Sequence, residues 1–306
     1  MEDKFKSGDL VEILTPQEII QTLDSRGTIH GLPFMAEMIA YCGKRYRVRS
    51  KIEKTCVVTG KMREFINDDV VYLENLRCDG SSHDGCQRGC LIFWNEAWLK
   101  KVDDDNDTNI DPIIEDASLL RSRLITKNSP DKYFCQSTQL SEATQKLSHT
   151  QRISKLIKEI RSNTVGLMTG LKSTIFPIWW RARFKKLIGG LAQTPISELN
   201  LEPGEIVEVK SFEEIKSTLD KKGRNRGLEF HYDMMQFCGK QYRVRNRLEK
   251  MISEASGKML KIKNTVILED VTCDFAYRFW GCSRCIFQYW REIWLKRIDN
   301  KRLQPK

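Results

Sequence analysis

The sequence has few histidines and lacks long apolar stretches. Four histidines occur among 306 residues, and no Gly-rich phosphate loop follows a predicted strand, so residue types for acid–base or phosphate chemistry are scarce. No run approaches eighteen consecutive apolar residues, which excludes a transmembrane helix. The opening residues, MEDKFKSGDLVEIL, contain no apolar segment of the kind found in signal peptides. We therefore expect a cytoplasmic protein whose thiols stay reduced, with peripheral attachment to a membrane as an alternative.

Charge is unevenly distributed along the chain. The formal net charge is +10. Residues 151–190 hold nine Lys and Arg side chains against one Glu, whereas residues 103–116 hold seven acids and no Lys or Arg. Hydrophobic residues make up 40% and charged residues 30% of the chain, which is typical of a soluble globular protein. An acidic segment therefore precedes a strongly basic one in the middle of a mildly basic chain.

The chain contains an internal duplication. GDLVEILTPQEIIQTLD matches GEIVEVKSFEEIKSTLD, and YCGKRYRVRSKIEK matches FCGKQYRVRNRLEK. YLENLRC and ILEDVTC, and then WNEAWLKKV and WREIWLKRI, follow in the same order. Each copy is long enough to form its own domain. The domains that we expect are a first repeat module (1–102), an acidic and polar linker (103–150), a basic amphipathic helical segment (151–195) and a second repeat module (196–306).

Each module has the pattern of a mainly β fold with short helices. An alternating strand leads into a helix capped by Thr15 or Ser211, and Glu18 or Glu214 follows three residues later, which is the capping-box pattern. A second short helix is expected before the YCGK and FCGK motifs. RYRVRSKI and QYRVRNRL then alternate apolar and basic side chains, as a half-buried strand does. This pattern predicts two tandem SH3-like small barrels joined by a helical segment.

The region between the modules has a different character. Residues 103–150 are polar and begin with an acidic run, so we expect them to be largely flexible. A helix is expected from Gln151, because the apolar residues between Ile153 and Ile160 fall on one face. A second apolar and basic stretch contains Pro177, which we place at or near the start of a helix.

Four cysteine positions recur in the two copies. They are Cys42, Cys78, Cys86 and Cys90 in the first copy and Cys238, Cys273, Cys282 and Cys285 in the second. A tetrahedral zinc ion needs four converging ligands and tolerates the change from C-x3-C to C-x2-C that separates the two loops. The sequence therefore predicts a four-cysteine metal site in each module and two Zn²⁺ ions per chain. An iron–sulfur cluster and reduced structural thiols are the alternatives.

Other positions differ between the copies. Cys56 aligns with Ile252, which predicts a spare thiol or a substitute ligand. Cys135 lies in the linker and is expected to be an unpaired thiol. His83 has no counterpart in CDFAYRFWGC and is expected to be a solvated loop residue, with metal ligation as the alternative. The tryptophans that recur are expected to anchor the two cores: Trp94, Trp98, Trp290 and Trp294.

Several motifs are long enough to support a resemblance. Through GLPFMAEMIAYCGKRYRV, EKTC and LENLRCDGSSHDGCQRGCLIFWNEAWLKKV, the first copy resembles an uncharacterised family of bacterial proteins built from small cysteine-containing modules. The second copy resembles a sister version through FCGKQYRV, NTVILE and YWREIWLKRI. Together these motifs cover roughly two thirds of the chain. The family has no established activity, so the resemblance supports the cysteine positions and implies no chemistry.

The function that we expect is a non-catalytic, metal-stabilised binding or scaffold protein. Residues 151–190 combine basic with aromatic side chains, which suits an unidentified protein partner or an anionic membrane surface. A helical segment that packs between the modules is the structural alternative. The residues expected to make the contact are Trp179, Trp180, Arg181, Arg183, Lys185 and Lys186.

Two other functions remain open at this point. Nucleic-acid binding would use the basic strands, where a tyrosine stands among arginines that could follow phosphates, unless the basic face is simply solvated. A metal-dependent or iron–sulfur enzyme is the second alternative, although the recurring Glu96 and Glu292 are expected to be solvated or salt-bridged rather than general bases. The candidate nucleic-acid contacts are Arg45, Tyr46, Arg47, Arg49, Tyr242, Arg243 and Arg245.

Overall fold

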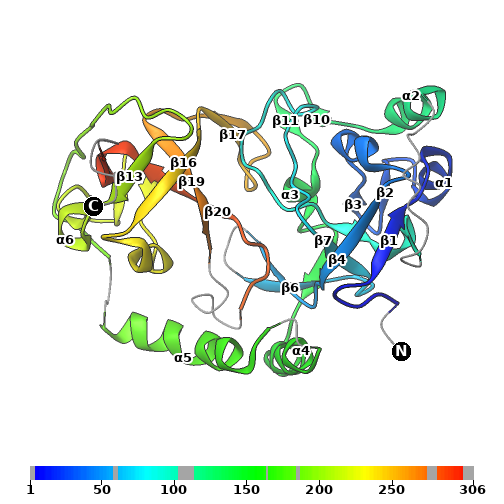
Figure 1. Ribbon diagram of the computed structural model, residues 1–306, viewed down its shortest axis with the longest axis horizontal. Helices are drawn as coiled ribbons and strands as arrows, with labels where there is room; N and C mark the ends of the chain where they lie inside the picture. Colours follow the sequence, from blue (N-terminus) through cyan, green and yellow to red (C-terminus); the bar gives the residue numbers. More distant parts are fainter. Residues whose placement is uncertain are drawn as a thin grey trace, which may run out of the picture. The chain divides into compact units, whose positions relative to one another are not determined.

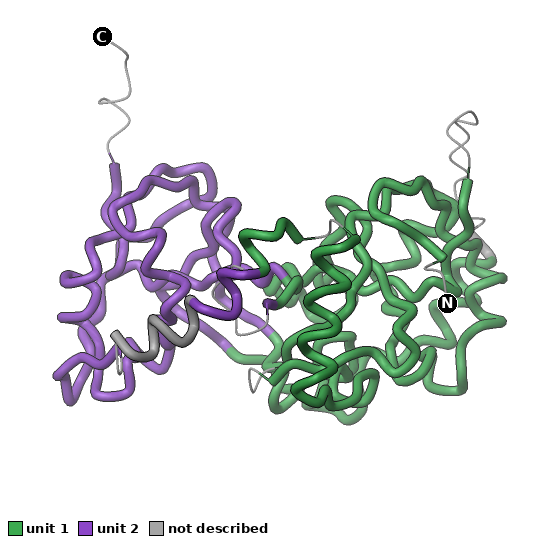
Figure 2. The backbone as a smooth tube through the Cα atoms, turned by 90° about the horizontal axis from the view of Figure 1, so that it is seen from below, with its two compact units in different colours: residues 1–170, 252–260, 282–284 green, residues 171–251, 261–281, 285–306 purple. Residues whose placement is uncertain are grey.

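The computed structural model is mainly β with short helices and divides into two units (Figures 1 and 2). Unit 1 comprises residues 1–170, 252–260 and 282–284, and unit 2 comprises the rest. The division crosses the sequence repeat, because two short segments of the second copy belong to unit 1. The residues that the structure describes are 4–57, 61–102, 114–162, 165–183, 187–273 and 281–298.

The elements of unit 1 are short strands and helices of 3 to 13 residues. They are β1 (Leu10–Ile13), α1 (Pro16–Thr22), β2 (Thr28–Ile29), β3 (Leu32–Pro33), the 3-10 helix η1 (Ala36–Tyr41), β4 (Arg45–Lys51), β5 (Thr55–Cys56), β6 (Met62–Phe65), β7 (Val70–Leu73), β8 (Trp94–Asn95), η2 (Glu96–Trp98), β9 (Leu99–Lys101), α2 (Ile114–Arg123), β10 (Lys127–Ser129), β11 (Lys132–Tyr133), α3 (Gln136–Gln139), β12 (Thr144–Lys146) and α4 (His149–Arg161).

Unit 2 repeats the first part of this order. Its elements are β13 (Ile206–Val209), α6 (Phe212–Lys216), β14 (Arg224–Asn225), β15 (Leu228–Glu229), η3 (Tyr232–Phe237), β16 (Gln241–Arg247), β19 (Thr265–Thr272), β20 (Phe287–Arg291), η5 (Glu292–Trp294) and β21 (Leu295–Arg297). The elements α5 (Leu167–Arg183), β17 (Lys250–Ile252) and β18 (Met259–Lys261) each include residues of both units.

A five-stranded antiparallel sheet forms the centre of each unit. The strand order is β8-β7-β4-β1-β9 in unit 1 and β20-β19-β16-β13-β21 in unit 2. The register is also the same, since Val11 lies opposite Tyr46 and Val207 lies opposite Tyr242. The duplication seen in the sequence is therefore a duplication of one strand arrangement.

The helix that follows the first strand begins as its sequence predicts. In α1, Thr15 Oγ1 accepts from the Glu18 amide at 3.4 Å, and Glu18 Oε2 accepts from the Thr15 amide at 2.8 Å. Ser211 and Glu214 make the same two bonds at α6. Both capping boxes are confirmed, and each satisfies amides that the first helical turn leaves without internal partners.

Aromatic side chains fill the equivalent core positions of the two sheets. Trp94, Trp98, Trp290 and Trp294 are all fully buried, as predicted. Phe34 meets Trp98 edge-on with ring centroids 5.2 Å apart, and Phe230 meets Trp294 in the same way at 5.4 Å. Such T-shaped pairs add to the free energy gained from burying the ring area.

The segment after the first module is ordered, so the expectation of a largely flexible linker is wrong for residues 114–150. β10 and β11 form a hairpin, and β12 pairs with β6 of the module. The few apolar side chains of this polar stretch are buried, with Phe134 and Leu140 only 2% and 1% exposed. The free energy gained by burying these side chains offsets the conformational entropy lost when the segment becomes ordered. The polar composition alone did not indicate this gain.

The central helices also differ in part from the prediction. α4 covers the helix expected from Gln151. α5 begins at Leu167, so Pro177 lies inside the helix and not at its start. Within the described residues, none of the helices has both the length and the apolar character needed to cross a membrane.

Candidate functional site

The loop between Cys78 and Cys90 is closed by its own backbone. The Cys78 amide donates to the Cys90 carbonyl at 2.8 Å, and the Gly85 amide donates to the Gly80 carbonyl at 2.9 Å. Gly80 has φ +71°, and a Cβ placed on it would lie 2.1 Å from the Cys86 carbonyl oxygen. Only glycine fits there, because the backbone passes too close for any side chain.

Thiols of this loop interact by charge with one another and with Cys135. Burial is the largest cause of the raised pKa of Cys78, of Cys86 and of Cys135, and the Cys90 thiol raises all three further. Cys135 also raises the pKa of Cys78, and its own pKa is raised to about 11. Loop thiols therefore share one region of unit 1 with a cysteine that we had expected to be an unpaired linker thiol.

Backbone amides also point at these sulfurs. The amide of Ile252 donates to Cys86 Sγ at 3.3 Å. Amides of Gly80 and Arg88, each two residues beyond a cysteine, act on Cys78 and Cys86 and lower their pKa values against the effect of burial. Amide donors of this kind stabilise a thiolate, which is the form that binds a metal ion.

Cys42 has different surroundings. Burial raises its pKa to about 12, offset only by its own backbone amide. The glycine after it turns away from the thiol, since the Gly43 amide donates to the Ile13 carbonyl at 2.8 Å. Cys238 repeats this arrangement, with a pKa raised by burial to about 11 and the Gly239 amide bound to the Val209 carbonyl. The Cys-Gly-Lys turn thus connects the 3-10 helix to β4 or β16 and is hydrogen-bonded to β1 or β13.

The structure places the cysteines of the second copy in both units. Cys282 belongs to unit 1, where it packs in a small buried cluster with Cys56, Met62 and Leu147. Cys273 belongs to unit 2, where its sulfur accepts from the Ile286 amide at 3.3 Å. Residues 274–280 of this loop lie outside the described part of the chain. Across the described residues, no group of three or more His, Cys, Asp or Glu side chains is arranged to hold a metal ion.

His83 is buried, so the expectation of a solvated loop histidine is wrong. Its side chain is 2% exposed, with Nδ1 2.5 Å from Glu37 Oε1 and Nε2 3.0 Å from the Phe134 carbonyl. Burial lowers its pKa, but the hydrogen bond and charge of Glu37 raise it more, and the net shift is upward. As an imidazolium, His83 donates on both sides and joins the cysteine loop to residue 134.

A buried ionic cluster holds the second-copy segments of unit 1. The Glu254 carboxylate accepts from Arg284 at 2.9 and 3.1 Å and from Arg88 at 2.9 Å. Ser137 Oγ donates to Glu254 at 3.1 Å and accepts from Arg88. Arg284 also donates to the Cys56 carbonyl at 2.7 Å. The sequence contained no signal for this cluster, because its members are far apart in the chain and local patterns do not record them.

The basic side of α4 faces acids of unit 1. Lys155 Nζ lies 2.8 Å from Asp68 and 3.2 Å from Glu53, and Lys158 lies 2.8 Å from Glu53. Lys54 and Glu159 form a further ion pair in which both side chains are buried. These cations of the helical segment are thus neutralised within the unit, whereas its apolar Ile153 and Ile157 are 45% and 44% exposed.

The predicted nucleic-acid contacts take part in the sheets. Arg45 pairs with Glu12 at 3.1 Å, and Arg47 donates to the Gly8 carbonyl. In unit 2, Arg243 donates to the Gly204 carbonyl and Arg245 lies over the Phe287 ring. Tyr46 packs edge-on against Tyr41, and Tyr242 packs in the same way against Phe237. Arg49 is exposed.

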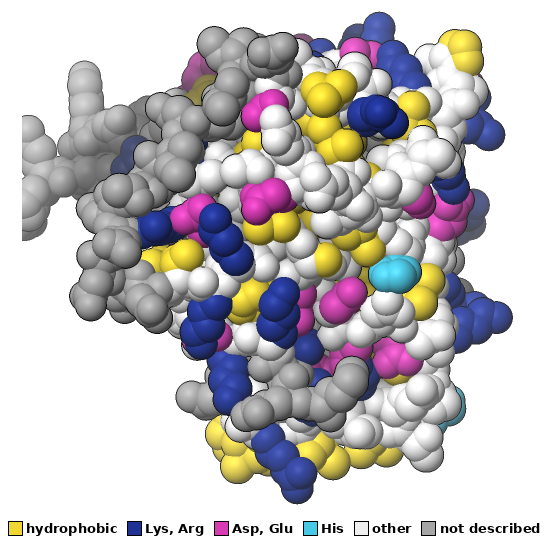
Figure 3. All heavy atoms as spheres, turned by 90° about the vertical axis from the view of Figure 1, so that its right-hand side faces the viewer, with side chains coloured by type: hydrophobic (Ala, Val, Ile, Leu, Met, Phe, Trp, Pro, Cys, Tyr) yellow, Lys and Arg dark blue, Asp and Glu magenta, His cyan; other side chains and the backbone are white. Residues whose placement is uncertain are grey.

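On the face drawn in Figure 3, Lys and Arg side chains lie among Asp and Glu, with hydrophobic and uncharged groups between them.

The side chains predicted to contact a membrane or partner lie outside the described part of the structure. Trp179, Trp180, Arg181 and Arg183 lie on the backbone of α5, but their side chains are outside the described part. Lys185 and Lys186 lie outside the described residues.

The recurring glutamates form salt bridges, which is one of the two environments predicted for them; the other was exposure to solvent. Glu96 is 7% exposed with Lys51 at 3.6 Å, and burial raises its pKa. Glu292 is fully buried and lies 3.2 Å from Arg247. Its carboxylate also accepts from the amides of residues 199–201. Glu292 therefore holds the segment of unit 2 that leads into β13.

Comparison with known proteins gives no relative. A search of family models finds none that matches the chain, and no curated protein or solved structure matches it.

Proposed function

We propose that this protein is a non-catalytic scaffold of two SH3-like modules in which cysteine thiolates bind zinc. The observation that carries the proposal is the closed Cys78–Cys90 loop of unit 1, in which the Cys78 amide donates to the Cys90 carbonyl and Cys86 Sγ accepts from the Ile252 amide. The charge of Cys90 also contributes to the raised pKa values of Cys78, Cys86 and Cys135. Four thiolates are the usual ligands of structural zinc. A module of this size gains folding free energy from such an ion.

The proposal changes the fourth ligand of the first site. Cys135 takes the place that we had predicted for Cys42, because the charge of Cys90 contributes to the raised pKa of Cys135, whereas burial and its own backbone amide set the pKa of Cys42. For the second copy, ligation by Cys238, Cys273, Cys282 and Cys285 stays a prediction. A site with four thiolates is saturated and leaves no position for water, so it supports a structural role.

Elemental analysis of the purified full-length chain tests this proposal. We expect about two zinc ions per chain and no visible colour. Cys135→Ser should lose about one ion, whereas the matched variant Cys42→Ser should keep both. Equal zinc content in the two variants would reject Cys135 as a ligand. A chain without zinc would reject the proposal, and a brown sample absorbing in the visible would favour the iron–sulfur enzyme instead.

The partner that we propose is a protein rather than a membrane. Anionic lipid attracts cationic side chains that are free to reach it, but Lys155 and Lys158 of α4 are paired with acids of unit 1. After sedimentation with anionic liposomes, the protein should stay in the supernatant. Co-sedimentation that declines with added salt would reverse this preference.

A further inference from the structure

A groove of unit 1 is filled by the chain itself. The side chain of Gln136 is 3% exposed. Its amide nitrogen donates to the carbonyls of Phe93 and Pro33 at 2.8 and 3.1 Å, and its amide oxygen accepts from the Phe93 amide at 2.9 Å. Phe93 directly precedes β8, an edge strand of the sheet. The glutamine amide thus supplies the hydrogen bonds that a neighbouring strand would supply.

Two other contacts hold the same segment in place. The guanidinium of Arg26 lies 5.1 Å from the centre of the Phe134 ring and 3.0 Å from Glu142. Gly31 allows the segment to pass close by, since a Cβ there would lie 3.2 Å from the Glu142 carbonyl carbon. Residues 134–142 therefore contact the first module through an aromatic ring, a glutamine side chain and a carboxylate.

Unit 2 has equivalent positions, and among the described residues a pocket lies where residues 134–142 pack in unit 1. The duplication matches Pro33, Met38 and Phe93 with Glu229, Met234 and Tyr289. All three matching residues line a pocket of about 130 Å³. Gly227 matches Gly31, and in the described part of the chain no heavy atom lies within 4 Å of a Cβ placed on it.

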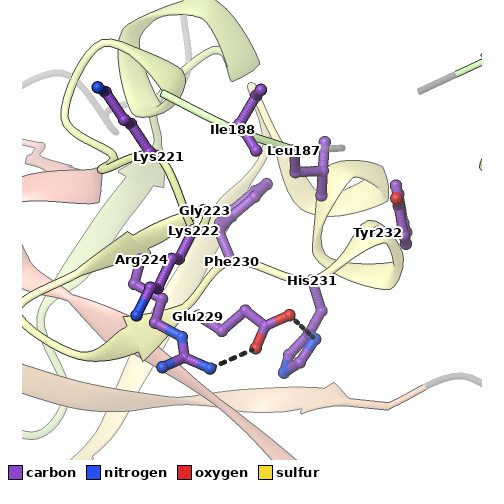
Figure 4. A pocket seen from close by; sticks show the side chains of 10 residues that line it. All are labelled: Leu187, Ile188, Lys221, Lys222, Gly223, Arg224, Glu229, Phe230, His231 and Tyr232. Carbon is purple, nitrogen blue, oxygen red and sulfur yellow. Dashed lines mark ion pairs between the residues drawn. The ribbon is translucent and has the colours of Figure 1, made fainter. Parts of the chain in front are cut away.

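Unit 2 has a second pocket beside the first. It lies at the position that corresponds to the contacts of Arg26 with Phe134 and Glu142 in unit 1. This pocket has a volume of about 370 Å³ and shares Glu229 and His231 with the first one. Lys222 matches Arg26 in the repeat. Lys222 lines the pocket together with Lys221 and Arg224 (Figure 4). Glu229, the acid of this pocket, lies 3.7 Å from both Arg224 and His231.

We propose that these two pockets of unit 2 bind an extended segment of a partner protein. The segment carries an aromatic residue, a glutamine two residues later and a carboxylate a few residues beyond. The glutamine enters the smaller pocket beside Met234, and the carboxylate pairs with Lys222. This inference names the partner of the proposed scaffold, and it does not depend on the zinc ions.

The chemistry of the partner follows from the chain's own segment. Three cations against one acid make the larger pocket attract an anion. A glutamine side chain that bonds to an edge strand gives register as well as affinity, since its amide matches both a donor and an acceptor of the backbone.

A peptide taken from this chain provides the probe. Residues 131–143 with Cys135 replaced by serine, labelled with a fluorophore, should bind the full-length protein in a polarisation titration. Lys222→Glu should weaken binding at least about tenfold, because it reverses the charge that meets the peptide carboxylate. The matched control Lys216→Glu, on the surface of α6 outside both pockets, should bind as the unchanged protein does.

Peptide variants separate the contacts. Replacing the glutamine that corresponds to Gln136 by alanine should also weaken binding about tenfold. The proposal is overturned if the peptide does not bind, or if Lys222→Glu and Lys216→Glu bind it equally. It is also overturned if the protein forms a dimer that the peptide dissociates, because a second copy would then be the occupant. A failure of this kind would leave the zinc content unchanged, so it can be told apart from a failure of the metal proposal.

Discussion

The carboxylate of Glu254 and the guanidinium of Arg284 form a two-pronged ion pair, with N–O distances of 2.9 and 3.1 Å and side chains 5% and 4% exposed. Both residues come from the second sequence repeat, but they lie in unit 1. Burial favours the neutral form of Glu254, yet the charges of Arg284 and Arg88 lower its pKa overall. The carboxylate is therefore ionised near neutral pH and holds two arginines.

Glu254→Gln should strongly destabilise unit 1. The substitution keeps the size of the side chain but leaves the buried guanidinium of Arg284 and the partly buried one of Arg88 without this counter-charge. Breaking a buried pair in this way costs about 3–5 kcal/mol. The free energy of unfolding in urea measures the loss.

Asp131→Asn is the control for the buried pair. It removes an ion pair with Lys258 whose side chains are 59% and 53% exposed, and an ion pair this open to solvent contributes little to stability. If Glu254→Gln loses no more stability than Asp131→Asn, the buried cluster does not hold unit 1 together.

Glu159 should make stability depend on pH. Burial raises its pKa from 4.5 to about 7, although Lys54 acts in the opposite direction. Between these two values the folded chain keeps a proton that the unfolded chain releases, so the folded state loses stability as the pH rises through this window. Urea unfolding at about pH 5 and about pH 8 should show this loss.

Glu159→Gln removes the group that titrates and should reduce the difference between the two pH values. Because Lys54 is left without a carboxylate, the variant should be less stable at both. The slope with pH is therefore the informative quantity. Equal slopes in the two proteins would show that Glu159 is not the titrating group.

Gly31→Ala and Gly227→Ala should separate the filled groove from the open one. Both glycines have positive φ, +79° and +82°, so alanine strains the backbone of each by about 1 kcal/mol. At Gly31 the new Cβ also meets the backbone of Glu142, whereas at Gly227 no described atom lies within 4 Å. We expect Gly31→Ala to cost about 1–3 kcal/mol more in urea unfolding. Equal costs would contradict the contrast between the two grooves.

Features recorded in short stretches of sequence could be predicted. The capping boxes at Thr15 and Ser211 need only four residues, and the tryptophan anchors recur with their neighbours in both copies. A duplicated pattern also implies a duplicated strand order, which the two sheets share.

Contacts between distant polar residues could not be predicted. Gln136 and Ser137 lie in a polar stretch typical of a flexible linker, yet both are buried because Phe93 and Glu254 offer them hydrogen bonds. The repeat draws attention to Cys42, since it marks residues that both copies keep. Cys135 lies outside the duplicated segments, so the repeat could not draw attention to it.

The assignment of residues 252–260 and 282–284 to unit 1 has a consequence for synthesis of the chain. A ribosome releases the N-terminal residues first, and domains usually fold in that order. Here Arg88 and Ser137 emerge long before Glu254 and Arg284, so unit 1 stays incomplete until synthesis has reached residue 284. A gene cut at the repeat boundary would yield a fragment that never leaves that state.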